Sequence, residues 1–191
     1  QEDFFQQRKE AFAQFNTLGF PTIKHEEWKY SNVRSLISET YNFSHPDTVT
    51  QTDLDTLQIP NLTGNILYFI NGVYRPDLST IVSPESEVTI LPLSEAKTTQ
   101  PELFYAYFNK LAKNEEEAFT ALNTAFSTEG VFIHVPSGSV VGEPIILRYI
   151  ADSRNENIGV QTRIVIAAEA NAQVKIAEAF RTLGDNRSFS N

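Results

Sequence analysis

The chain has 191 residues, of which 41% are hydrophobic and 20% charged, a composition typical of one globular domain or two small ones. The net charge of −9 and the lack of clustered Lys and Arg exclude an ordinary nucleic-acid binder. The cysteine count is zero, which excludes disulfides, thiolate nucleophiles and cysteine-ligated metal clusters from these residues and favours a cytoplasmic location. No apolar run approaches the roughly 20 residues that span a bilayer, and no signal peptide opens the chain, so we expect no membrane association.

Residues 2–16 have the periodicity of an amphipathic helix. Five apolar side chains gather on one side at 3.6-residue spacing: Phe4, Phe5, Ala11, Phe12 and Phe15. The opposite side lacks the row of Lys and Arg that a membrane-surface helix requires. We therefore predict a helix that packs against the rest of the protein.

The segment 18–33 is dense in unlike residue types. His25 with Glu26 or Glu27 allows a metal or acid–base interpretation, because imidazole and carboxylate are common partners in such sites. Adjacent residues point in different directions, however, and no second histidine stands nearby. The spacing favours an ordinary turn in which Trp28 and Tyr30 bury their rings, with the Trp28 ring largely buried.

A polar connection follows at 38–63. It contains at most a short helix at 53–57, which Asp53 is suited to cap. His45 lies in this connection just before a proline and has no obvious partner. We predict no functional role for it.

The clearest local signal is a hairpin at 64–75. An apolar run at 66–70 is followed by Asn71-Gly72, the favoured type I′ turn pair, and by a short return strand at 73–75. A further strand is predicted at 88–91. Together they predict a small antiparallel meander.

Residues 101–126 have a helical pattern that Asn114 breaks into two stripes. The apolar positions of these stripes are Leu103, Phe104, Tyr107, Leu111, Ala118, Phe119, Leu122 and Ala125. Glu115, Glu116 and Glu117 invite a metal interpretation, but consecutive helical positions fan out and do not converge on one ion. We interpret the three acids as first-turn residues that the helix dipole favours.

Four β-rich runs then follow, at 131–135, 145–149, 163–167 and 174–177, without any helical pattern between them. A sandwich, a barrel and a β-solenoid all fit this succession. His134 lies within the first run and is interpreted as a hydrogen-bonded surface or wall residue. Five spread-out arginines are interpreted as solubility or ion-pairing residues: Arg148, Arg154, Arg163, Arg181 and Arg187.

Five segments, taken together and in this order, resemble the SufB/SufD family of iron–sulfur cluster assembly proteins, and its SufD branch in particular. They are LGFPTIKHEEWKYSNV (18–33), YFINGVYRPDLS (68–79), VTILPLSEA (88–96), ALNTAFSTEGVFIHVPSG (121–138) and EPIILRY (143–149). The resemblance runs from about residue 18 to the end. No single motif in it is as specific as a metal–cysteine signature.

The resemblance implies a fold that is mostly β with an α-helical N-terminal region, at the start of a right-handed parallel β-helix, which is a solenoid. Residues 1–126 would form the helical region with its small antiparallel meander. Residues 127–191 would form the first rungs of a truncated β-helix core. Because a cut solenoid exposes strand edges, we expect that self-association through 163–177 is possible.

The resemblance also implies a non-enzymatic scaffold of the SUF complex, working with a SufB-type partner and a SufC-type ATPase. The full complex would handle an iron–sulfur cluster transiently. The cysteine and histidine of cluster chemistry and the ATPase-docking segment lie, in the family, in parts that we expect this chain to lack. We therefore assign no catalytic residue, no cofactor ligand and no metal ligand here.

Two alternatives from other classes stay open. A carbohydrate-active β-helix enzyme, a polysaccharide lyase or hydrolase, would need converging carboxylates. The acids near the strands are Glu143, Asp152, Glu169 and Glu178, and strand alternation pairs none of them. A stand-alone structural solenoid is the other alternative.

Overall fold

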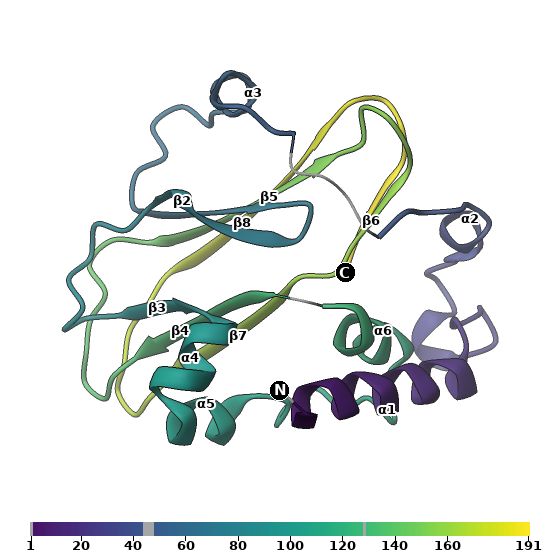
Figure 1. Cartoon of the computed structure of the whole chain (residues 1–191), viewed down its shortest axis with the longest axis horizontal. Coiled ribbons are helices and arrows are strands. Elements are labelled where there is room, and N and C mark those ends of the chain that lie inside the picture. The colour runs from purple at the N-terminus through teal and green to yellow at the C-terminus, as the bar shows by residue number, and fades with distance from the viewer. Residues whose placement is uncertain (1, 44–47, 128) are drawn as a thin grey trace.

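The computed structural model describes residues 2–43, 48–127 and 129–191, with side chains from Phe5 onward (Figure 1). The helices are α1 (Glu2–Leu18), the 3-10 helix η1 (Glu26–Trp28), α2 (Arg34–Ile37), α3 (Gln51–Thr56), α4 (Leu93–Thr99), α5 (Pro101–Tyr107) and α6 (Ala118–Phe126). The strands are β1 (Asn65–Ile70), β2 (Val73–Thr80), β3 (Thr89–Pro92), β4 (Gly130–Val135), β5 (Ile145–Asp152), β6 (Ile158–Val160), β7 (Arg163–Ala168), β8 (Ile176–Leu183) and β9 (Ser188–Ser190).

Three sheets organise the described strands. Their strand orders are β2-β1-β5-β8, β3-β4-β7 and β6-β9. The strands β4, β5 and β6 each pair in parallel with a strand three places further along the chain, β7, β8 and β9. Both larger sheets therefore end on a late strand, β8 or β7, and in the described sheets each of these has a neighbour on one edge only.

The main core lies between the two larger sheets. Alternate side chains of β1, β4 and β5 point into it, as the period of two in a strand dictates. Its buried members include Leu67, Phe69, Val131, Ile133, Ile145 and Leu147. Helices cover the outer faces: α4 and α5 pack on the β3-β4-β7 sheet, and α3 packs on β1 and β5 on the far side (Figure 1). This second cover explains why every residue of β5 is buried.

The hairpin prediction is confirmed, but the antiparallel meander is wrong. Asn71 and Gly72 have φ values of 49° and 86°, as a type I′ turn requires, and β1 pairs antiparallel with β2. The predicted strand at 88–91 exists as β3, yet it pairs with β4 in a different sheet. The sheet that holds the hairpin continues from β1 to β5 in parallel, and in the described sheets no strand pairs with the outer edge of β2, where a meander would place β3.

The helical pattern at 101–126 is correct at its ends and wrong in the middle. Helix α5 stops at Tyr107, since Asn109 adopts a left-handed φ of 56° and the Phe108 ring turns back to stack on Phe104 at 4.6 Å. Leu111, predicted to lie in the apolar stripe, is 94% exposed. Asn114 does not cap α6 but accepts a hydrogen bond from the Thr124 hydroxyl at 2.8 Å.

The predicted first helix is confirmed as α1, which packs across α6. Ala11 is fully enclosed at this contact, and Arg8 Nε donates a hydrogen bond to the Ala125 carbonyl at 2.9 Å. The predicted short helix also exists, as α3. Its N-cap residue is Thr50, so the prediction that Asp53 is the cap is wrong. Asp53 is instead the third helical residue, and its side chain completes a capping box with Thr50.

The expectation of buried rings at 18–33 is wrong for Tyr30 and too strong for Trp28. Tyr30 is 92% exposed. The Trp28 ring is partly buried and lies 5.1 Å from the ring of Phe119 on α6. The three residues of η1 include none that is buried, and Trp28 packs against α6 from its surface.

Arg148 was expected to be a surface arginine, and this expectation is wrong. It lies in the middle of β5, only 3% exposed, and its guanidinium donates hydrogen bonds to the Tyr68 hydroxyl at 3.0 Å and to the Leu57 carbonyl. The guanidinium carbon also lies 5.1 Å from the Tyr68 ring centre. Arg148 thus ties the chain that follows α3 to the outer face of the sheet.

We predict that Arg148→Met lowers the free energy of unfolding by about 2–3 kcal/mol, because a partly buried hydroxyl and a partly buried carbonyl lose a charged donor. Denaturant unfolding measures this change. Arg181→Met, at an exposed position on β8, is the matched control and should change stability by less than about 0.5 kcal/mol. Equal losses for the two variants would contradict the prediction.

Candidate functional site

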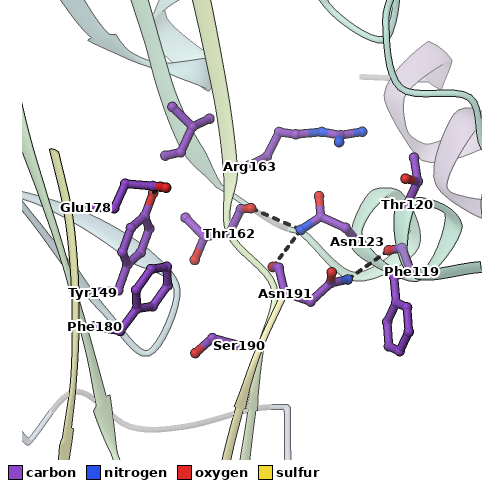
Figure 2. A pocket seen from close by; sticks show the side chains of 11 residues that line it. Phe119, Thr120, Asn123, Tyr149, Thr162, Arg163, Glu178, Phe180, Ser190 and Asn191 are labelled. Carbon is purple, nitrogen blue, oxygen red and sulfur yellow. Dashed lines mark hydrogen bonds between the residues drawn. The ribbon is translucent and has the colours of Figure 1, made fainter. Parts of the chain in front are cut away.

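A pocket opens where α6 meets the late strands β7, β8 and β9. Its volume is about 420 Å³. Figure 2 shows its lining, which comes from segments far apart in the sequence. The lining residues are Phe119, Thr120, Asn123, Tyr149, Thr162, Arg163, Ile164, Glu178, Phe180, Ser190 and Asn191.

Strand register places the aromatic wall of this pocket. Leu147 and Tyr149 point into the core, and the parallel pairing of β5 with β8 sets Glu178 opposite Leu147 and Phe180 opposite Tyr149. Because paired residues in a parallel sheet share a face, Glu178 and Phe180 point the same way. The rings of Tyr149 and Phe180 stack at 4.5 Å.

The tyrosine and the acid in this wall are hydrogen-bonded to each other. The Tyr149 hydroxyl donates to Glu178 Oε1 at 2.8 Å (Figure 2). Burial raises the pKa of Tyr149 well above its ordinary value, and the hydrogen bond with Glu178 raises it further. The phenol therefore stays protonated at neutral pH and acts as a donor.

The opposite wall is built from amide side chains. Asn123 Nδ2 donates to the carbonyls of Thr162 and Asn191, at 3.0 and 2.8 Å, and Asn191 Nδ2 donates to the Phe119 carbonyl at 2.7 Å (Figure 2). These bonds join α6 to Thr162, the residue before β7, and to Asn191, the residue after β9. Asn123 Oδ1 is buried and has no hydrogen-bond partner among the described residues.

Arg163 lines the same pocket and is not the surface residue that was expected. Its guanidinium donates to Asn109 Oδ1 at 2.8 Å and to Thr124 Oγ1 at 2.5 Å. Burial lowers the pKa of Arg163. The side chain connects the start of β7 to α6 and to the segment after α5, so the pocket is framed by fixed groups. Its chemistry suits binding or closure by hydrogen bonds and aromatic contacts.

The histidines do not form a site together. His25 is exposed, and its Nδ1 accepts a hydrogen bond from the Thr22 amide at 3.0 Å, which fits the ordinary-turn interpretation. His45 lies outside the described residues. His134 lies far along the chain on β4. Among the residues that the structure describes, no group of three or more His, Asp or Glu side chains could hold a metal ion.

His134 is hydrogen-bonded, as expected, but its partner was missed. Its Nε2 lies 3.0 Å from Glu169 Oε1, while Glu169 Oε2 accepts from the Ser137 amide at 3.1 Å. The hydrogen bond with His134 lowers the pKa of Glu169. The partner follows from the register, since His134 pairs opposite Ala167, two residues before Glu169. The pair fixes the turn after β4 onto the end of β7.

The three consecutive acids precede α6 and are not its first turn. Glu117 is the N-cap residue and α6 begins at Ala118, so the dipole interpretation is wrong in position. Burial raises the pKa of Glu117, and the neighbouring carboxyl of Glu27 raises it further. The segment 18–33 and the start of α6 therefore meet here.

The remaining candidate acids each have a separate setting. Asp152 is bound by Arg154, with Nη2 at 2.7 Å, and by the Thr48 hydroxyl at 2.6 Å. Glu143 is exposed in the turn before β5. With Glu169 on His134 and Glu178 on Tyr149, the four acids have no shared partner among the described residues.

Comparison with known proteins gives the family. Residues 2–147 match the family model described as the SufBD protein N-terminal region. The chain belongs to the SufBD family. None of the described helices of this SufBD chain is long and apolar enough to cross a membrane.

Similar individual proteins carry the same family name. The "Iron-sulfur cluster assembly SufBD family protein slr0076" of Synechocystis sp. is 26% identical over 179 residues, which are 94% of this chain and 39% of that protein. The "Iron-sulfur cluster assembly protein SufD" of Escherichia coli is 24% identical over 186 residues, 96% of this chain and 41% of that protein. The SufBD family protein ABCI9 of Arabidopsis thaliana is 25% identical over 123 residues. This chain thus spans about two fifths of the length of the first and second of these relatives.

Asp152 makes the stability of the fold depend on pH, with a sign that follows from its pKa. The hydrogen bond from Arg154 lowers the pKa of Asp152 to about 2, against burial, which raises it. A carboxyl whose pKa is lower in the folded state stabilises the fold above its unfolded pKa of about 3.9, and this stabilisation is lost as the pH falls towards 2. We predict that Asp152→Asn lowers the free energy of unfolding by about 2 kcal/mol at pH 7.

The deficit of Asp152→Asn should shrink between pH 4 and pH 2, because the parent protein then loses the same charge. Denaturant unfolding at several pH values measures this. Asp185→Asn, at an exposed carboxylate, is the control and should follow the parent at every pH. A deficit that does not change with pH would contradict the assigned pairing with Arg154.

Proposed function

We propose that this chain belongs to a scaffold protein of iron–sulfur cluster assembly. The family match over residues 2–147 carries the proposal, and the relatives in Synechocystis and Escherichia coli are named for iron–sulfur cluster assembly. The proposed role is non-enzymatic. It includes a cytoplasmic location, which the absence of cysteine from these residues favours.

The finer proposal is a SufD-like role in a SUF complex, beside a SufB-type protein and a SufC-type ATPase. Similarity to SufD of Escherichia coli over 96% of the chain supports the SufD branch. We place the contact with the ATPase and the ligands of the cluster outside these 191 residues. The cluster is then cargo that the complex handles transiently, and this segment supplies a rigid support.

We further propose that β4 to β9 are the first rungs of a right-handed parallel β-helix. The parallel pairing of three successive strands with the next three supports this, because a stack of rungs repeats in that way. Another strand can add to β7 and to β8 in the same manner. Self-association through these two edges stays a prediction.

A carbohydrate-active enzyme is the alternative from another class. It requires carboxylates that converge on one substrate position. Asp152, Glu169 and Glu178 instead have three different partners, in Arg154, His134 and Tyr149. These contacts favour the scaffold over the lyase or hydrolase. A stand-alone structural solenoid differs from the scaffold only in its partners.

The test of the scaffold is co-purification at full length. We expect the full-length protein to bind a SufB-type and a SufC-type protein from the same organism in a complex that survives gel filtration. A variant with Ile176→Asp and Phe180→Asp, on the edge strand β8, checks whether the stack must stay intact. A parent protein that elutes alone at micromolar concentration would contradict the scaffold and favour the stand-alone solenoid.

A separate prediction concerns iron. We expect the 191-residue segment to bind no iron and no cluster by itself, because it has no cysteine and its three histidines, His25, His45 and His134, lie in separate segments. Anaerobic reconstitution with iron and sulfide, followed by metal analysis, should leave it without metal. Stoichiometric iron that persists through gel filtration would contradict this expectation.

A further inference from the structure

An apolar groove runs along α1 where this helix meets the C-terminal end of α6. It consists of two adjoining hollows of about 380 and 260 Å³. Phe12 and Phe126 line both hollows. Their rings lie between the hollows and contact each other edge to face, with 5.8 Å between the ring centres. We call these two hollows the α1 groove. In Figure 1 the groove-forming helices α1 and α6 lie side by side.

The α1 groove exposes more aromatic surface than the packing of α1 requires. Ala11 is the residue that α1 encloses against α6, whereas Phe5 is 62% exposed and Phe12 46% exposed. On the other side of Phe126 the ring of Phe43 stacks at 5.4 Å and is also exposed. A contiguous exposed apolar patch of this kind marks an interaction surface more often than chance exposure does.

The charged residues that line the larger hollow are both positive, on a chain whose net charge is −9. Arg8 and Lys9 line the larger hollow together with Phe5 and Phe12. Neither cation has a carboxylate within ion-pair distance among the described side chains, and Lys9 lies 5.6 Å from the Phe5 ring centre. Glu39, which lines the smaller hollow, already pairs with Arg187 at 3.3 Å.

We propose that the α1 groove binds an amphipathic helix of a partner protein that carries acidic residues beside its apolar stripe. Two hollows separated by one aromatic pair suit two apolar side chains spaced three or four positions apart on one helix. Arg8 and Lys9 are placed to meet an acid flanking the first of them, which is charge complementarity against an otherwise acidic surface.

The same features disfavour a lipid surface. A helix that lies in a bilayer interface presents a convex apolar face bordered by several Lys and Arg residues. The α1 groove is concave, has two cations, and sits on a protein whose net charge opposes anionic lipid. The proposal does not depend on the scaffold function, since it rests on the side chains that line the α1 groove.

The experiment selects a partner from a displayed library of amphipathic helices, using the full-length protein as bait. The flanking positions of the library are randomised among Asp, Glu, Lys, Arg, Ser and Gln. We expect the selected helices to be enriched in Asp and Glu and to hold apolar residues three or four positions apart. No enrichment over a bait with Phe12→Asp would overturn the proposal.

Variants then assign the contacts of a selected peptide, measured by fluorescence anisotropy. Phe12→Ala should weaken binding at least about tenfold. Lys9→Glu, at an exposed position, should weaken acidic peptides several-fold and shift a repeated selection towards Lys and Arg flanks. Leu111→Ser removes an apolar side chain that is more exposed than Phe12 and lies away from the groove, and it should leave the affinity unchanged. Thermal unfolding confirms that each variant is folded.

Other occupants are distinguished in the same series. Binding to vesicles with 30% anionic lipid that Phe12→Ala abolishes would overturn the proposal in favour of a membrane. A dimer in sedimentation that Phe12→Ala dissociates would overturn it in favour of a second copy. Peptides whose affinity does not respond to Lys9→Glu would overturn the acidic character of the partner.

Discussion

Parallel pairing between strands about thirty residues apart is the constraint on which the rest of this structure depends. It places side chains of one kind on each other: Val131 beside Ile164, Ile145 beside Ile176, and Tyr149 beside Phe180. The core can then continue from one layer of strands to the next. The close approach has a strict requirement at Gly130, where a Cβ atom would lie 1.8 Å from the Arg163 carbonyl oxygen. Only glycine allows β4 and β7 to begin side by side.

Polar side chains attach the helices to this stack. Arg148 holds the segment after α3 on the outer face of β5, and Asp152 with Arg154 reaches Asp53 on α3 itself. Asn123 and Arg163 do the same for α6. Hydrogen bonds depend on direction, whereas apolar packing does not. These contacts therefore fix the positions of the helices on the sheets.

Local features were predictable from the sequence, and features set by the strand register were not. The type I′ turn at Asn71, the first helix and the four later strands follow from residue type and period. The place of β3 depends on its antiparallel pairing with β4, a strand much further along the chain, and no local signal indicates that pairing. The short strands β6 and β9 were missed because three residues carry too little pattern.

The contacts of the candidate site could not be predicted from the sequence for the same reason. His134 and Glu169 lie 35 positions apart, and they meet only because Ala167 pairs opposite His134. The burial of Arg148 and the framing role of Arg163 likewise require knowledge of what covers each strand. The spread-out arginines were interpreted as solubility or ion-pairing residues. Arg154 and Arg187 do form ion pairs, while the fold uses Arg148 and Arg163 as internal anchors.

Helix α6 contributes to both surfaces that distinguish this chain. Asn123 forms a wall of the pocket between the late strands, and Phe126, three residues further on, forms the ridge of the α1 groove. A displacement of α6 by a helix in the groove must therefore alter the geometry of the Asn123 bonds to Thr162 and Asn191. Any resulting coupling is reciprocal by thermodynamic necessity, so contacts at the strand edges would change affinity at the groove by the same factor. One short helix thus connects the N-terminal surface to the residues beside β7 and β9.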